Sequence, residues 1–122
     1  MSPPHYCRLY LDTGLDLAET RRRLEDEVQR TFPDLIVHAV ASRNEGFEPS
    51  GGGAYDPIAA SRWTVEIDSE IDPFDVFQAG VCRLIENLRT DGMIVTASCD
   101  FEDRVTAETG WNWTVSSPDP PG

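Results

Sequence analysis

The sequence predicts a single domain of the α+β class. Several stretches alternate apolar and polar residues with the period of two that is typical of strands, and two longer stretches repeat apolar residues with the period of a helix. The two kinds of stretch alternate along the chain. The 122 residues have the length of one domain and are enough to bury an apolar core without metals or disulfides.

The chain begins with a predicted strand, residues 5–12, followed by a predicted helix, residues 16–32. Asp16 is the expected N-cap residue of this helix, and Glu19 three positions later is its expected capping-box partner. Pro33 ends the helix because proline has no N–H to donate and its ring clashes with the preceding turn. The apolar side of the strand consists of Cys7, Leu9 and Leu11, and the apolar stripe of the helix consists of Leu17, Leu24, Val28 and Phe32.

Two further strands are predicted in the middle of the chain, at residues 35–41 and 62–68. They are separated by a long connection, residues 42–61, which contains three successive glycines, Gly51, Gly52 and Gly53. Glycine leaves the backbone unconstrained, and a connection of this length is uncommon in a compact domain unless it is functional or disordered. We therefore expect residues 42–61 to form a flexible loop.

A second helix is predicted at residues 73–90, and a strand at residues 93–101 follows it. Asp72 is the expected N-cap, and Pro73 suits the first helical position, where an N–H has no partner within the helix. Gly92 is the expected C-cap residue. A wide apolar face makes this the clearest helix in the sequence; it consists of Phe74, Phe77, Val81, Leu84, Ile85 and Leu88.

The C-terminal part of the chain is predicted to contain little regular structure. Residues 102–110 are acidic and are interpreted as a solvated turn, and residues 111–115 alternate as a short final strand. Residues 118–122 contain three prolines and are expected to be a disordered tail, so the domain spans residues 1–117.

The predicted order is strand, helix, strand, loop, strand, helix, strand, with one extra C-terminal strand. This order is similar to the ferredoxin-like, split βαβ arrangement, in which two helices cover one face of an antiparallel sheet. Since that architecture hosts many unrelated functions, the similarity implies a fold and no activity.

Charge is the strongest functional signal in the composition. The chain holds 22 acidic residues and 10 basic ones, all arginine, for a net charge of −12. Such a field repels nucleic-acid phosphates and anionic lipids, so we expect no nucleic-acid or membrane partner. It attracts a basic protein and accelerates encounter with it. The first residues show no charged segment followed by an apolar one, and we therefore expect a cytoplasmic location.

The sequence contains no recognisable catalytic or cofactor-binding motif. The three cysteines, Cys7, Cys82 and Cys99, lack the spacing of zinc ligands or of a redox motif, and we interpret them as free, largely buried thiols. Neither His5 nor His38 is placed by the pattern beside a cysteine. We therefore expect a protein that is not an enzyme and that needs no cofactor and no metal ion.

The candidate binding site lies near the C-terminus, where two tryptophans stand close to several carboxylates. Aromatic residues are enriched at the centres of interfaces, and surrounding acids would suit a basic partner. Two tryptophans that are separated by one residue in a strand face the same side, so packing in the core is the alternative. The candidate partner-binding residues are Asp100, Glu102, Asp103, Glu108, Trp111 and Trp113.

The leading hypothesis is an acidic protein-binding domain, one form of which is an inhibitor or immunity-type protein that neutralises a basic partner such as a nuclease toxin. The alternative is a small-molecule-binding protein or a cofactor-free enzymatic homodimer that uses the open face of the sheet. On that alternative the pocket would be lined by Tyr6, Arg8, Tyr10 and His38.

Overall fold

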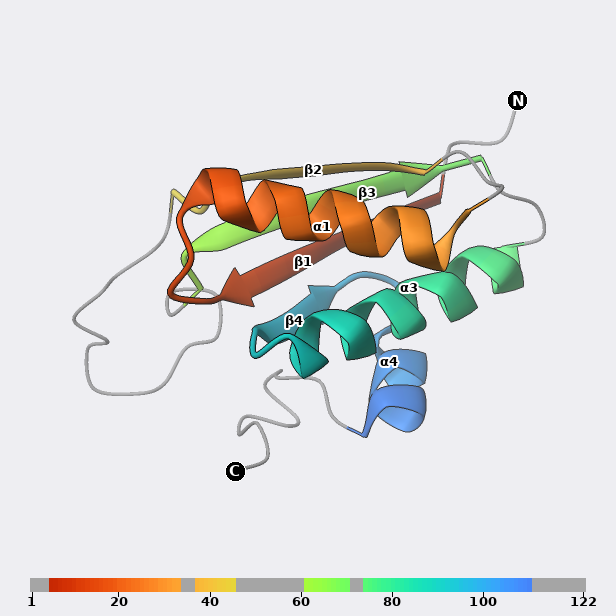
Figure 1. Cartoon of the computed structure of the whole chain (residues 1–122). Coiled ribbons are helices and arrows are strands. Elements are labelled where there is room, and N and C mark those ends of the chain that lie inside the picture. The colour runs from red at the N-terminus through yellow and green to blue at the C-terminus, as the bar shows by residue number, and fades with distance from the viewer. Residues whose placement is uncertain (1–4, 34–36, 46–60, 71–73, 111–122) are drawn as a thin grey trace.

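The computed structural model describes residues 5–33, 37–45, 61–70 and 74–110, which form an α+β fold (Figure 1). The predicted α+β class is confirmed: a four-stranded antiparallel sheet is combined with three helices in this part of the chain. The strands are β1 (His5–Asp12), β2 (His38–Arg43), β3 (Trp63–Ser69) and β4 (Ile94–Ser98), and the helices are α1 (Leu17–Thr31), α3 (Phe74–Thr90) and α4 (Glu102–Thr109).

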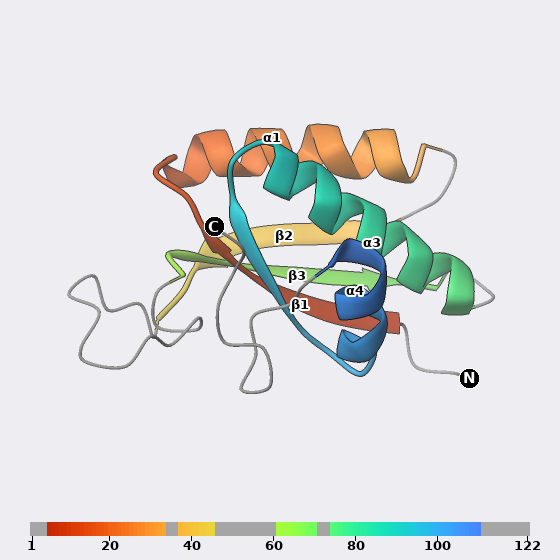
Figure 2. The same ribbon diagram turned by 90° about the horizontal axis from the view of Figure 1, so that it is seen from below.

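The strands follow the order β2-β3-β1-β4, and each neighbouring pair is antiparallel. Figure 2 shows α1 and α3 side by side on one face of this sheet, with α4 next to α3. Because β1 occupies an interior position, its side chains contact neighbours on two strands. Arg8, for example, lies opposite Glu66 of β3 and opposite Ser98 of β4.

The hydrophobic core lies between the sheet and the two long helices. The side of β1 that was predicted to be apolar faces the helices, and the apolar face of α3 packs in the same buried cluster. The two helices approach closely at Gly80, where an added Cβ atom would stand 2.1 Å from Cε1 of the Phe32 ring. The largest fully buried side chains are those of Phe77, Leu9, Leu11, Leu24, Ile67, Leu84, Ile85, Leu88, Val65, Val81 and Val95.

The start of α1 and the end of α3 agree with the sequence signals. Oδ1 of Asp16 accepts a hydrogen bond of 2.8 Å from the Glu19 backbone N–H, which confirms Asp16 as the N-cap of α1. The Glu19 carboxylate binds Arg22 and Arg23 of the same helix. Gly92 has a φ of 94°, and the Met93 N–H donates to the Leu88 carbonyl, so Gly92 ends α3 as predicted.

The turn predicted at residues 102–110 is wrong, because Glu102–Thr109 form the helix α4. Val105 anchors this helix in the core, where it is fully buried, and Gly110 ends it with a φ of 93°. Glu102 and Asp103 occupy the first turn, where negative side chains are favourable because they lie near the positive end of the helix dipole.

Two strands differ from their predicted limits. The strand predicted at residues 35–41 is β2, which covers residues 38–43, and the strand predicted at residues 93–101 is β4, which covers residues 94–98. Among the helices that the structure describes, none has the length and apolar character needed to cross a membrane. The following predicted features lie outside the described residues: most of the loop at 42–61, the Asp72 N-cap with Pro73, the strand at 111–115 and the tail at 118–122.

Candidate functional site

An uncompensated group of carboxylates stands where β4 leads into α4. Asp100 and Asp103 are exposed and Glu102 is half-buried. None of the three forms an ion pair with another described residue. We call these three residues the acidic corner. The structure thus brings together the first half of the predicted partner-binding set, because its members are adjacent in sequence around the start of one helix.

Glu108, the fourth predicted carboxylate, is held away from this corner by an ion-pair network between α3 and α4. It pairs with Arg104, whose Nη1 atom also binds Oδ1 of Asp75 at 2.6 Å and Oε1 of Gln78 at 3.1 Å. The network raises the pKa of Arg104, first through its hydrogen bond to Glu108 and then through that to Asp75. Glu108 therefore helps to attach α4 to α3. Trp111 and Trp113 lie outside the described residues.

The face of the sheet opposite α1 and α3 carries the alternative pocket residues. The Tyr6 hydroxyl donates a hydrogen bond of 2.9 Å to Oε1 of Glu66, and Nη2 of Arg8 binds the same oxygen at 2.7 Å. Tyr6 is 45% exposed. Burial and then the bond to Glu66 raise the pKa of Tyr6, whereas Arg8 and then Tyr6 lower the pKa of Glu66.

The remaining members of the alternative set share this face but differ in exposure. His38, which is exposed, lies opposite Asp68 on β3, and Asp68 in turn lies opposite Tyr6. Tyr10, in contrast, is buried. The four residues thus lie on one face as the period-two pattern predicts, and the Arg8–Glu66 ion pair lies on the same face.

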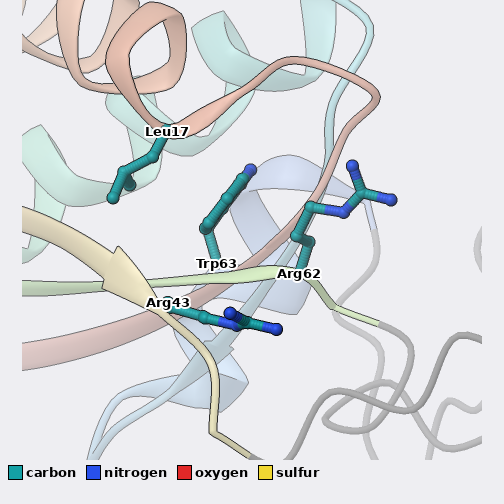
Figure 3. Close-up of a pocket in the computed structure, with 4 residues that line it drawn as sticks. All are labelled: Leu17, Arg43, Arg62 and Trp63. Atoms are coloured by element: carbon teal, nitrogen blue, oxygen red, sulfur yellow. The ribbon is translucent and has the colours of Figure 1, made fainter.

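A cavity of about 420 Å³ lies instead at one end of the sheet, close to the start of α1 (Figure 3). Leu17, Arg43, Arg62 and Trp63 line it, and both arginine side chains extend beyond Trp63 on the side away from Leu17. The Trp63 indole N–H donates a hydrogen bond of 3.1 Å to the Leu15 carbonyl, which fixes the ring against the segment that leads into α1.

The charge around this cavity is positive in an otherwise acidic protein. Arg43 and Arg62 are both exposed, and the Arg43 guanidinium forms no ion pair with a described carboxylate. Burial raises the pKa of the nearby Asp12 carboxyl, and the positive charge of Arg62 partly offsets that effect. This site could not be predicted from the sequence, because the pairing of Arg43 with Trp63 across β2 and β3 joins residues that are distant along the chain.

The described residues offer no obvious place for a metal ion. No group of three or more His, Cys, Asp or Glu side chains in residues 5–33, 37–45, 61–70 and 74–110 is arranged to hold one. All three cysteines are free thiols; Cys7 and Cys82 are buried, and Cys99 is half-buried.

Comparison with known proteins adds no assignment to these sites. The chain matches no protein-family model, no curated protein and no solved structure. A function for this protein must therefore be inferred from the acidic corner, the open sheet face and the arginine-lined cavity.

Proposed function

We propose that this protein is a non-enzymatic binding domain that docks onto a basic protein partner, in the manner of an inhibitor or immunity protein that neutralises a nuclease or another cationic toxin. The observation that carries this proposal is the acidic corner, in which Asp100, Glu102 and Asp103 stand together without ion-pair partners among the described residues. Blocking a cationic protein requires complementary charge and shape, and it requires no catalytic group.

The ion pairs that arginines form outside the acidic corner support the same proposed function. Several of them are paired with carboxylates of their own or a neighbouring element, so they do not neutralise the acidic corner. With a net charge of −12, the molecule attracts a basic protein over a distance of about 10 Å at moderate salt. The acidic corner would then provide the short-range contacts.

The test is capture of a basic protein by this domain from an extract of its own cells at low salt. Reversal of two charges, in the double variant Glu102→Arg and Asp103→Arg, should weaken the capture by about tenfold or more, and capture by the unmodified protein should fall steeply as salt is added. The matched control is Glu25→Arg with Asp26→Arg, which reverses two charges on α1 and should have a smaller effect. If both double variants weaken capture equally, net charge rather than the acidic corner would explain binding. Undiminished capture by the first variant would refute the proposal.

We also infer that the strands and long helices form the split βαβ, ferredoxin-like arrangement. The connection β1-α1-β2 has β3 inserted between its two strands, and the connection β3-α3-β4 has β1 inserted between its two strands. Two interlocked units of this kind, with α1 and α3 on the same face, are what that arrangement requires. This inference concerns the architecture and adds nothing to the case for a particular activity.

The arginine-lined cavity favours a second candidate function, the binding of a small organic anion. Two guanidinium groups suit a carboxylate, and the apolar surfaces of Leu17 and Trp63 suit a flat apolar body. With benzoate as the probe, the NMR signal of the Trp63 indole N–H should shift on titration. The shift should disappear in Arg43→Gln and persist in Arg83→Gln, which removes an exposed arginine of α3. An unmoved indole signal would exclude this function for aromatic carboxylates.

A further inference from the structure

The three cysteines are far apart in sequence, but the fold gathers them in one region. Arg8 of β1 lies opposite Ser98, the last residue of β4, and Cys7 and Cys99 are the residues directly beyond this pair on the two chains. The Cys7 thiol donates a hydrogen bond of 3.8 Å to the Arg8 carbonyl oxygen. It also lies close enough to Cys99 for each thiol to shift the pKa of the other.

Cys99 occupies a position that stabilises a thiolate. It is half-buried and precedes α4, whose N-cap residue, Phe101, makes no capping bond with its side chain. The neighbouring Cys7 thiol and, after it, the backbone N–H of Phe101 lower the pKa of the Cys99 thiol, although burial and the carboxylates of Glu102 and Asp100 act in the opposite direction. A thiolate at the start of a helix is favoured by the same N–H groups that favour other anions there.

The other two thiols are buried, and their pKa values are raised. Cys7 is fully buried, and its bond to Cys99, followed by burial, raises its pKa. Burial raises the pKa of Cys82 to about 11, and the negative charge of Glu108 adds to the increase. The three cysteines therefore differ in role, with one accessible thiol, one buried thiol directly beside it, and one buried thiol engaged elsewhere.

We propose that Cys99 is a site of oxidation by small peroxides and that Cys7 is its resolving thiol, so that oxidation joins the start of β1 to the end of β4 by a disulfide. The inference is independent of the proposed docking function. It depends on the juxtaposition of an accessible sulfur with a buried one across two neighbouring strands.

The chemistry needs no group beyond the peroxide. The Cys99 thiolate attacks one oxygen of hydrogen peroxide, the O–O bond breaks, and the products are a sulfenic acid on Cys99 and, after proton transfer, water. The sulfur of Cys7 then attacks the Cys99 sulfur, the S–O bond breaks, and the thiol proton leaves with the hydroxyl as a second water. Two thiols have lost two electrons and two protons, and the peroxide has been reduced to two waters.

The backbone geometry permits this bond. Residues directly opposite each other in antiparallel strands have Cα atoms about 4.5–5.5 Å apart, and disulfides occur at Cα separations of about 4.4–6.8 Å. A disulfide formed here thus calls for rotation of two side chains and no rearrangement of the sheet. Peroxide carries no charge, so the acidic residues beside Cys99 do not repel it.

The test is treatment of the intact protein with a small excess of hydrogen peroxide, followed by tryptic digestion without reduction. Cleavage after arginine places the three cysteines in separate peptides, residues 1–8, 63–83 and 90–104. We expect loss of two hydrogens from the whole protein and a disulfide between peptides 1–8 and 90–104. The Cys82→Ala variant is the matched control and should give the same product at the same rate.

Two further variants separate the roles of the thiols. Cys99→Ser should slow the reaction with peroxide at least tenfold, because the remaining thiols are buried. Cys7→Ala should still be oxidised at Cys99 and should accumulate the sulfenic acid, which dimedone traps. The proposal is wrong if Cys99→Ser reacts as fast as the unmodified protein, or if the unmodified protein accumulates sulfenic or sulfinic acid at Cys99 without forming the disulfide. A disulfide that involves Cys82 would also overturn it.

Discussion

Helices α3 and α4 pack against each other but are held in the fold by different forces. α3 contributes many of the fully buried side chains, Phe77, Val81, Leu84, Ile85 and Leu88. α4 buries Val105 as its one core side chain among the described residues. Its other attachments are polar, from Arg104 to α3 and from Arg89 of α3, whose Nη1 atom donates to the Thr109 hydroxyl at 2.7 Å. Helix α3 is therefore part of the hydrophobic core, whereas α4 is attached to the edge of the core mainly by polar contacts.

This difference matters because the acidic corner and the Cys99 site both depend on the start of α4. The acidic corner includes the first turn of α4, and Cys99 lies just before its N-cap residue. Segments with few buried apolar contacts open locally at free energies below that of global unfolding. Local opening of α4 would release the Phe101 N–H from the Cys99 sulfur without dismantling the sheet, so the two sites share one element of low local stability.

The sharpest test of the comparison truncates one buried side chain in each helix. Phe77→Ala should lower the free energy of unfolding by about 3–5 kcal/mol, because it leaves a cavity where Phe77 meets Phe101 edge to face. Val105→Ala removes two methyl groups from a fully buried side chain and should lower it by about 2 kcal/mol. Urea denaturation of both variants measures the two values.

The ratio of the two effects is the informative quantity. If Val105→Ala lowered the free energy of unfolding as much as Phe77→Ala, α4 would be an integral part of the core. That result would contradict the conclusion that α4 is attached mainly by polar contacts. The surface variant Glu25→Arg provides the reference, since a single exposed substitution normally changes stability by less than about 0.5 kcal/mol.

The same contrast explains which parts of the fold could be predicted from the sequence. α3 was predictable because six apolar residues share one face of the helix, which is the pattern that periodicity detects. α4 was not, because a single core residue makes no stripe and because its N-cap is Phe101 and not one of the residues that favour that position. Gly110 at its end was the one signal available.

The candidate sites also differ in how far they could be predicted from the sequence. Asp100, Glu102 and Asp103 were predictable as a group because they are nearly contiguous. The proximity of Cys7 to Cys99, which adjoin the Arg8–Ser98 pair, and the pairing of Arg43 with Trp63 depend on the register between strands that are distant in sequence. Alternation within each strand assigns a residue to a face of the sheet, but it leaves open which strand lies beside it and at what offset.

Helices α3 and α4 each end at a glycine. Gly92 and Gly110 have nearly the same positive φ, 94° and 93°, and a Cβ atom added to either would meet no heavy atom within 4 Å. Alanine at each position should therefore be destabilising by about 1 kcal/mol through the backbone conformation alone. Both variants should lower the global free energy of unfolding by this amount, because both strains are relieved in the unfolded chain.

Amide hydrogen exchange in α4 should distinguish the two variants. Opening of α4 alone relieves the strain at position 110 and leaves the strain at position 92 in place. Gly110→Ala should thus lower the exchange free energy of the α4 amides by about 1 kcal/mol, whereas Gly92→Ala should leave it unchanged while lowering that of the core strands. If both substitutions changed the α4 amides alike, α4 would open only together with α3, and the two helices would form one cooperative unit.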